Sequence, residues 1–282
     1  MALVNYKELL EYAREHKITI GGFNAINMEM IQAVSLAADH MNAPIIIQTY
    51  RNHIQYAGAD YMQAIANIAA RNAKVKLALG LDHGSSYEQA KLCIDNNYSG
   101  VMIDLASEDY EINVRETKRV VALAHEKGIS VEAELGTISD ADCTPEEIAL
   151  GYTDPIVARK FVEETKIDCL AVSVGTAHGS YKYPPKINFE LLKELIDTVA
   201  CPIVVHGGSG TPDSEVEKMV KMGIAKINIG TDFFNAYNQA IYKVFQEKGG
   251  AQCDIVEVMN AARNAVMSVA EQKLDILTRF RV

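Results

Sequence analysis

Short apolar runs alternate with amphipathic segments along the whole sequence, and this alternation limits the possible folds more than any other feature. The runs are rich in Val, Ile and Ala, which is typical of parallel strands covered on both faces. They predict strands at residues 18–23, 44–48, 76–81, 100–104, 130–135, 168–174, 202–205 and 225–229. The segments between them predict helices at residues 28–41, 61–71, 87–96, 114–127, 154–164, 189–199 and 213–222.

Repeated strand–helix units of this kind predict an α/β fold in which eight parallel strands close into a (β/α)8 TIM barrel. No linker rich in Pro, Gly or Ser divides the chain, so we expect residues 1–282 to form a single domain. Extra helices are expected at both ends, over residues 6–15 at the bottom of the barrel and within residues 254–280. A doubly wound open sheet is the competing architecture, but residues 21–24 do not supply its glycine-rich turn.

The bulk composition excludes several classes of partner. The net charge of −10 argues against general binding to nucleic acid or to membrane surfaces, which requires a positive patch. No apolar run is long enough to cross a bilayer, and the first residues show no signal-peptide pattern. The five cysteines are odd in number and lack CxxC spacing, so we expect a reduced, cytoplasmic protein.

Three histidines, His83, His178 and His206, follow predicted strands and have glycine or other small residues beside them. The loops after the strands of such a barrel meet at one end of it, so the three imidazoles can converge. Three imidazoles can hold a divalent metal and leave one coordination position open for a substrate. Each histidine alone could be an ordinary loop residue, but the repetition favours a metal site.

Carboxylates also occur at these strand ends. Asp82 can act as a general acid/base beside a metal, and its alternative role is to cap the helix that starts near Ser86. Glu132 and Glu134 share one face of their strand, which is the barrel interior, where a carboxylate is costly to bury without a cation. Asp104 is a weaker candidate of the same kind, and it could instead cap its own loop.

Glycine clusters follow the last two predicted strands, at residues 207–210 and 228–231. Free backbone N–H groups in such loops often bind phosphate, although glycine also makes ordinary turns. A lysine that forms an imine with the substrate would have to lie near the strand tops. The sixth strand has no lysine, and Lys226 enters at the bottom of the eighth, so metal chemistry is preferred.

These motifs resemble those of the metal-dependent class II fructose-bisphosphate/tagatose-bisphosphate aldolases, and the resemblance covers nearly the whole chain. It is carried by Leu-Asp-His-Gly-Ser-Ser at 81–86, Val-Met-Ile-Asp at 101–104, Val-Glu-Ala-Glu-Leu-Gly at 131–136, Gly-Thr-Ala-His-Gly at 175–179 and His-Gly-Gly-Ser-Gly at 206–210.

The resemblance implies a zinc-dependent enzyme that cleaves a ketose phosphate reversibly into dihydroxyacetone phosphate and an aldehyde. Zinc would be held by His83, His178 and His206, and Glu134 and Asp104 would serve an alternate or second metal position. Asp82 would exchange a proton with the C4 hydroxyl as the C3–C4 bond breaks. A monovalent cation, Na⁺ or K⁺, would lie near the C1 phosphate, whose predicted contacts are Gly179, Gly207, Gly208, Ser209, Asn228 and Thr231.

The sequence departs from the family in the loop after the fifth strand, which usually carries a Gly-Gly-x-Glu-Asp run. There a glutamate moves a proton of dihydroxyacetone phosphate. This chain has Thr-Ile-Ser-Asp-Ala-Asp-Cys-Thr-Pro-Glu-Glu at 137–147. Asp140, Asp142, Glu146 and Glu147 are all candidates, and we favour Asp142. The alternative for the last two is that Pro145 simply starts a short helix.

The half of the site that holds the aldehyde differs as well. Residues 49–53 read Thr-Tyr-Arg-Asn-His where the family commonly has small residues, and Phe233 and Phe234 stand where many members place a cation. Gly230 stands where fructose-specific members tend to have an acidic residue. We therefore expect an altered aldehyde pocket, in which Arg51 contacts an anionic group unless it is a surface residue. Asn24 and Gly230 are also expected to contact the substrate.

From this resemblance we expect the substrate to be fructose 1,6-bisphosphate, tagatose 1,6-bisphosphate or a phosphorylated deoxy-keto-gluconate. A different class of function is a non-catalytic homologue that binds metal and sugar phosphate, which the altered loop favours and the intact Asp82 opposes. Relatives in the family are usually dimers or tetramers, so we expect a homodimer or homotetramer.

Overall fold

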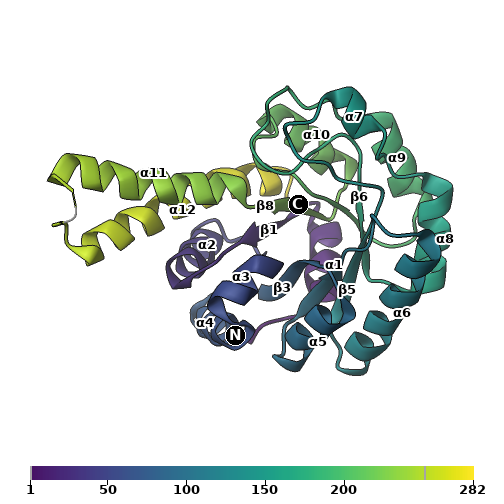
Figure 1. Cartoon of the computed structure of the whole chain (residues 1–282), viewed down its shortest axis with the longest axis horizontal. Helices are drawn as coiled ribbons and strands as arrows, with labels where there is room; N and C mark the ends of the chain where they lie inside the picture. The colour runs from purple at the N-terminus through teal and green to yellow at the C-terminus, as the bar shows by residue number, and fades with distance from the viewer. Residues whose placement is uncertain (1, 251) are drawn as a thin grey trace.

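The computed structural model describes residues 2–250 and 252–282 and has the predicted architecture, a closed barrel of eight parallel strands surrounded by helices (Figure 1). Each strand pairs with its neighbours in sequence, and β1 pairs with β8 to close the ring. The strands are β1 (Ile20–Asn24), β2 (Ile45–Tyr50), β3 (Leu77–Gly84), β4 (Gly100–Ile103), β5 (Ser130–Leu135), β6 (Cys169–Val172), β7 (Ile203–Val205) and β8 (Lys226–Ile229).

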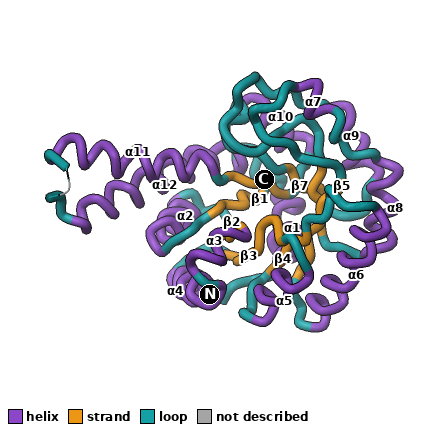
Figure 2. The backbone as a smooth tube through the Cα atoms, in the orientation of Figure 1, coloured by secondary structure: helices purple, strands orange, loops and turns teal. Residues whose placement is uncertain are grey.

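Helices cover the outside of the barrel, and the loops between them gather at its two ends (Figure 2). The helices of the described residues are α1 (Tyr6–His16), α2 (Met28–His40), α3 (Arg51–Ala57), α4 (Ala59–Asn72), α5 (Tyr87–Asp95), α6 (Tyr110–Glu126), α7 (Pro145–Ala149), α8 (Pro155–Thr165), α9 (Phe189–Thr198), α10 (Asp213–Met222), α11 (Thr231–Lys248) and α12 (Ile255–Thr278).

The predicted N-terminal plug is confirmed, because α1 packs against the lower interior of the barrel. Tyr6, Leu9 and Leu10 of α1 form one buried cluster with residues of the strands, among them Ile46 and Met102. The ring of Tyr6 enters where two strands carry glycine. A Cβ atom at Gly100 would lie only 2.6 Å from Cε1 of Tyr6, so this close approach requires glycine.

The helix expected within residues 254–280 is confirmed by α12, and a second long helix that was not predicted precedes it. No helix was predicted for residues 231–248, yet α11 occupies them and projects beside α12 as a hairpin on one side of the barrel (Figure 1). Among the described residues of α11, only Phe233 is buried. The base of α12 returns to the barrel, where the N–H of Thr19, just before β1, donates to the carbonyl of Leu277.

One strand is shorter than predicted for a clear reason. The prediction was residues 168–174, and β6 covers Cys169–Val172. Asp168 uses its carboxylate to accept from the N–H of Val131 at 2.7 Å, and the carbonyl of Val174 accepts from Asn188 in the following loop. The C-terminal end of the predicted run therefore hydrogen-bonds outside the strand ladder, whereas the N–H of Asp168 still donates to the carbonyl of Val131 in β5.

A buried ion pair lies between the plug and the open end of the barrel. Nζ of Lys226 lies 2.5 Å from Oε2 of Glu132, and both side chains are fully buried. The other carboxylate oxygen, Oε1, lies 2.9 Å from Nε2 of His206. Burial alone would raise the pKa of Glu132, but Lys226 and His206 lower it to about 2, so the carboxylate is ionised.

Removing only the cation of this pair should therefore destabilise the barrel strongly. We expect Lys226→Met to lower the free energy of unfolding by about 3–5 kcal/mol, because it leaves the Glu132 charge buried without its partner. Urea unfolding followed by circular dichroism measures the change. In the double variant Lys226→Met/Glu132→Gln no charge is left unpaired, so most of the stability should return. A loss below about 1 kcal/mol in the single variant would contradict this account.

Candidate active site

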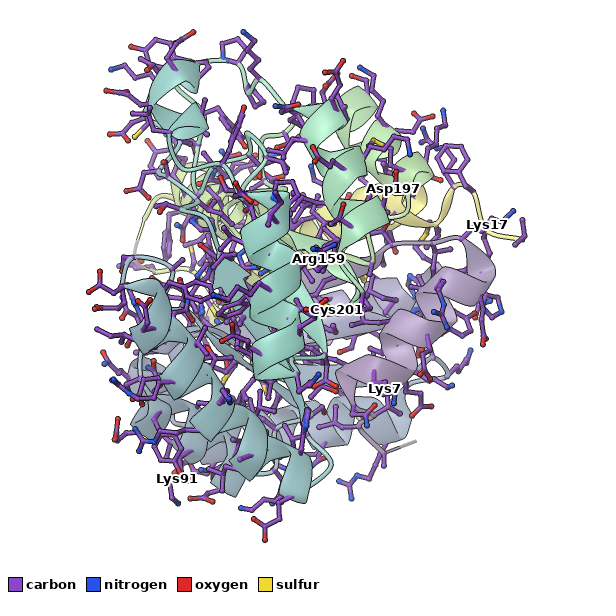
Figure 3. All side chains as sticks on the ribbon, turned by 90° about the vertical axis from the view of Figure 1, so that its right-hand side faces the viewer. Lys7, Lys17, Lys91, Arg159, Asp197 and Cys201 are labelled. Carbon is purple, nitrogen blue, oxygen red and sulfur yellow. The ribbon has the colours of Figure 1, made fainter. Side chains whose placement is uncertain are left out.

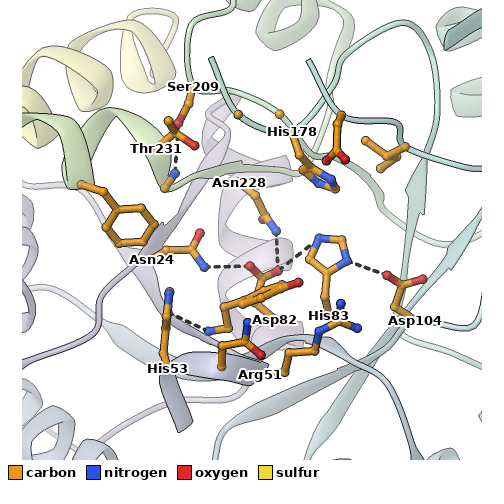
Figure 4. Close-up of a pocket in the computed structure, with 18 of the residues that line it drawn as sticks. Asn24, Arg51, His53, Asp82, His83, Asp104, His178, Ser209, Asn228 and Thr231 are labelled. Carbon is orange, nitrogen blue, oxygen red and sulfur yellow. Dashed lines mark hydrogen bonds and ion pairs between the residues drawn. The ribbon is translucent and has the colours of Figure 1, made fainter. Parts of the chain in front are cut away.

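The predicted site residues converge on a cavity of about 550 Å³ at the carboxyl ends of the strands. Figure 4 shows ten of the lining residues by name, with Asp82 and His83 at the centre. The predicted residues that line the cavity are Asn24, Arg51, Asp82, His83, Asp104, Glu134, His178, Gly179, Gly207, Ser209, Asn228, Gly230 and Thr231. His206 lies directly beneath, with its Nδ1 2.9 Å from Nε2 of His83.

A local irregularity at the end of β3 allows neighbouring residues to face the same cavity. Successive side chains of a regular strand point to opposite faces, so Asp82 and His83 should diverge. His83 has a φ of +49°, in the left-handed region that residues other than glycine rarely adopt, and the pairing of β3 with β4 shifts register between Leu81 and Gly84. Both side chains therefore reach the cavity, with Nε2 of His83 3.9 Å from Oδ1 of Asp82.

Each of the three imidazoles is held in place by a partner. In His83 and His206 the partner contacts one ring nitrogen, and the other nitrogen faces the neighbouring imidazole. Nδ1 of His83 is 2.6 Å from the carboxylate of Asp104, which leaves Nε2 free for a metal. Glu132 holds Nε2 of His206 in the same way and leaves its Nδ1. His178 is placed by backbone pairing, because its N–H donates to the carbonyl of Ser139.

Two features of the structure fit a bound divalent metal. The ligand atoms of His83, His178 and His206 all lie within 4.8 Å of one another, and so do those of His83, Asp104 and Glu134. Nε2 of His178 and Oε2 of Glu134 are buried and have no hydrogen-bond partner among the described residues. A metal ion would satisfy both atoms, and a set dominated by imidazole nitrogens suits zinc and similar transition metals.

The pKa values show that this cluster attracts positive charge. Burial lowers the pKa of His83, but the carboxylates of Asp82, Asp104 and Glu134 raise it more, to about 9. Burial and the two neighbouring imidazoles lower the pKa of His178 to about 3. Burial and the charge of Asp104 raise the pKa of Glu134 well above its usual range. Several carboxylates crowd around these three imidazoles, and this arrangement is the electrostatic environment of a cation site.

Asp82 is held by three side-chain amides from three strands. Nδ2 of Asn24 donates to its Oδ2 at 2.7 Å, and Nδ2 of Asn228 and Nε2 of Gln48 donate to its Oδ1 at 2.9 and 3.2 Å. Burial raises the pKa of Asp82, but the positive charges of His83, His206 and Lys226 and the Asn24 bond lower it below its usual value. The helix-cap alternative is wrong, because Ser86 caps α5.

Asp104 has both of the roles that the sequence left open. One carboxylate oxygen holds His83, and the other, Oδ1, accepts from the N–H of Ala106 in its own loop.

The two predicted phosphate-binding loops meet where α11 begins. Gly179, Gly207, Gly230 and Thr231 line this side of the cavity, and Oγ of Ser209 accepts from the N–H of Gly230 at 3.1 Å. The first turn of a helix presents free N–H groups, which favour anions. Gly208 is an exception, because it does not line the cavity and its N–H donates to the carbonyl of Asn228.

The loop after β5 places its acidic residues differently from one another. Asp140 and Asp142 are both exposed, but Asp140 lines the cavity and forms a β-bridge with His178, whereas Asp142 does not line the cavity. Glu147 accepts from the N–H and hydroxyl of Thr144 in a capping box, so Pro145 does start a short helix, α7. The preference for Asp142 is thus not supported by this geometry.

The other side of the cavity is formed by Arg51, which was predicted, and by residues that the sequence analysis quoted without giving them a role. Arg51 has its guanidinium 5.3 Å from the ring centre of Tyr50. The ring of His53 packs edge-on against Phe234, with centres 5.4 Å apart, and burial lowers the pKa of His53 to about 4, so its imidazole is neutral. Tyr50, Asn52, His53, Ile138 and Phe234 were missed, although most of them directly follow strand ends, which is the signal that identifies cavity residues in a barrel.

Comparison with known proteins identifies the family of the chain. A family model described as class II fructose-bisphosphate aldolase matches residues 4–279. A fructose-bisphosphate aldolase of Staphylococcus aureus (strain Mu50) is 35% identical over 277 residues, which are 97% of this chain and 96% of the relative. One from Geobacillus stearothermophilus is 33% identical over 279 residues, with the same coverage.

A solved aldolase structure has the same fold as this chain. The crystal structure of the YdjI aldolase from Escherichia coli K12 has a TM-score of 0.85 and 30% sequence identity, and the match covers 98% of this chain and 97% of that one. The residues that the family model matches include every strand of the barrel. The chain therefore belongs to the class II fructose-bisphosphate aldolases, a family of metal-dependent carbon–carbon lyases.

Proposed function

We propose that the protein is a zinc-dependent aldolase that reversibly cleaves a ketose (bis)phosphate, of the fructose or tagatose 1,6-bisphosphate type, into dihydroxyacetone phosphate and an aldehyde. The convergence of three imidazoles beside the ionised Asp82, at the floor of an open cavity, carries this proposal. His83, His178 and His206 would hold the zinc, with Glu134 and Asp104 as an alternate position. Zinc bound there would supply a Lewis acid for the carbonyl oxygen of the ketose.

Asp82 is the group that we assign to the proton transfer of the cleavage step. Its carboxylate takes the proton of the C4 hydroxyl, the C3–C4 bond breaks, and the electron pair of that bond moves toward the C2 carbonyl. Asn24, Gln48 and Asn228 orient the carboxylate and favour its ionised form, which is the form that can accept a proton.

The phosphate next to the ketose carbonyl is assigned to the side of the cavity formed by the loops after β6, β7 and β8. Gly179, Gly207, Ser209 and Thr231 offer backbone and hydroxyl donors near the start of α11, and Asn228 lies beside them. We also propose that a monovalent cation lies near this phosphate and that Gly208 contacts the phosphate. Gly208 would have to exchange its hydrogen bond to Asn228 for one to phosphate.

The opposite side of the cavity is assigned to the aldehyde. Arg51 has no carboxylate partner among the described residues and lines the cavity, so it can contact an anionic group at the far end of the substrate. Gly230 and the aromatic residues Tyr50 and Phe234 shape the remaining space. A phosphorylated deoxy-keto-gluconate is the alternative substrate for this pocket. The alternative function is that of a non-catalytic homologue that binds metal and sugar phosphate.

The projecting hairpin of α11 and α12 supports a homodimer or homotetramer. Tyr242, Ile255 and Val256 on this hairpin are each more than half exposed, at 64%, 65% and 61%, and apolar exposure of this kind marks interaction surfaces. No helix in the described part of the chain combines the length and apolarity needed to span a bilayer. We further propose that the chain acts as one domain in the cytoplasm, without a nucleic-acid or membrane partner.

The first experiment is an activity panel. Zinc-loaded protein should release dihydroxyacetone phosphate from one of fructose 1,6-bisphosphate, tagatose 1,6-bisphosphate or the phosphorylated deoxy-keto-gluconate, as measured with a coupled NADH assay. Chelation should abolish the release, and added zinc should restore it, because the metal is needed to polarise the ketone. Release from no substrate by folded, metal-bound protein would favour the non-catalytic alternative.

If Arg51→Ala leaves the specificity constant unchanged for every substrate, the proposed contact between Arg51 and the aldehyde half of the substrate is wrong.

Replacing Asp82 should separate turnover from binding. We expect Asp82→Asn to lower kcat by roughly 10²–10⁴-fold, because the amide cannot accept the proton of the C4 hydroxyl. Zinc content and the affinity for the substrate, measured by calorimetry, should change much less. Unchanged turnover would remove Asp82 from the proton-transfer step, whereas loss of zinc together with turnover would assign it to the metal site instead.

The acid that moves the dihydroxyacetone phosphate proton can be identified by paired substitutions. Since Asp140 lines the cavity, we expect Asp140→Asn to slow deuterium exchange of dihydroxyacetone phosphate by roughly 10²-fold or more, measured by NMR. Asp142→Asn should have a small effect. Glu146→Gln, an exposed position of α7, is the matched control. A larger effect of Asp142→Asn would restore the assignment made from the sequence and show that the loop moves during the reaction.

A further inference from the structure

A second cavity, of about 690 Å³, lies at the other end of the barrel from the active site. Its walls come from α1, from residues that precede β1, β6, β7 and β8, and from Phe280 near the C-terminus. The apolar residues of its floor include Leu10, Ala13, Ile203, Val220 and Ile224. The volume is in the range of small-molecule sites, which are mostly apolar with a few polar groups.

Cations surround this apolar floor. Lys7 and Arg14 of α1 line the cavity, and so do Lys17, which directly follows α1, and Lys221 of α10. Lys221 pairs with Glu217 at 2.9 Å, but no carboxylate within ion-pair distance of the other three is found in residues 2–250 and 252–282. Three unpaired cations around one cavity stand out in a chain whose net charge is −10.

The acidic residues at this cavity do not balance these charges. Asp168 is engaged by His125, whose Nε2 lies 2.9 Å away, and by the N–H of Val131. Glu11 is the other acidic lining residue. Burial raises the pKa of the Cys201 thiol to about 12, so this wall of the cavity is neutral. Figure 3 shows Lys7 and Lys17 at opposite ends of α1, with Cys201 on a neighbouring segment.

We propose that this cavity binds an amphipathic anion, a molecule with an apolar body and one carboxylate or phosphate group. The apolar body would displace water from the floor, where each buried CH₂ group contributes about 0.8 kcal/mol. Lys and Arg side chains lay their carbon stems along apolar surface and keep the charge at its edge, where it meets the anionic group. A neutral apolar ligand would leave the cations unpaired, and a fully polar phosphate would not use the floor.

The proposal is tested with two probes on the zinc-loaded full chain. The fluorescent amphipathic anion 8-anilinonaphthalene-1-sulfonate should bind saturably, and octanoate should displace it whereas octylamine should not. The variant Lys7→Glu/Lys17→Glu should weaken octanoate binding by roughly fivefold or more, since an exposed ion pair contributes up to about that factor. Higher salt should weaken octanoate binding in the parent protein more than in this variant.

Two further variants make the test specific to the cavity. Ala200 lines the opening and is exposed, so Ala200→Trp should block binding without disturbing the core. Lys118 is an exposed cation of α6 outside the cavity, and Lys118→Glu should leave binding unchanged. All variants should retain the melting temperature of the parent protein.

Three results would overturn the proposal. The first is octanoate binding that survives Ala200→Trp, and the second is equal displacement of the probe by octylamine. The third combines two observations: the parent protein does not bind octanoate, and Ala200→Trp has a changed oligomeric state, measured by light scattering. That last result would assign the surface to a second copy of this chain.

Discussion

The carboxylate of Glu132 connects the two ends of the barrel, and the site depends on it. An isolated carboxylate at a fully buried position would be neutralised or would destabilise the fold, so its position requires both Lys226 and His206. Because Glu132 occupies Nε2 of His206, the Nδ1 atom of that ring is the one directed toward His83. The ion pair thus sets which imidazole nitrogen faces the metal cluster.

The fold could be predicted from the sequence because its signal is local and repeated. Each predicted strand appears within a few residues of its expected position. The ends of those strands provide His83, Asp104 and Glu134 to one cavity and His206 directly beneath it. In a barrel, knowing that a residue ends a strand is enough to place it at the active end. The family membership that the motifs indicated is confirmed by the family model and the curated relatives.

Features that depend on contacts between distant residues could not be predicted. Lys226 was correctly expected at the bottom of β8, yet nothing in the sequence shows that it pairs with Glu132 rather than with solvent. The left-handed backbone at His83 is needed for Asp82 and His83 to share a cavity, and no glycine marks that position. The choice between Asp140 and Asp142 depends on how the loop after β5 pairs with the segment of His178, which periodicity does not indicate.

The closed ring has a consequence for how the chain is made. β1 and β8 come from opposite ends of the sequence, yet Ile20 lies opposite Lys226 in the ladder between them. Until β8 has been synthesised and has paired with β1, the barrel is an open sheet. The free edges of its first and last strands can then join to another chain. A truncation within α12 would therefore remove more than a surface helix, because it would withdraw support from the first strand and leave an open sheet prone to aggregation.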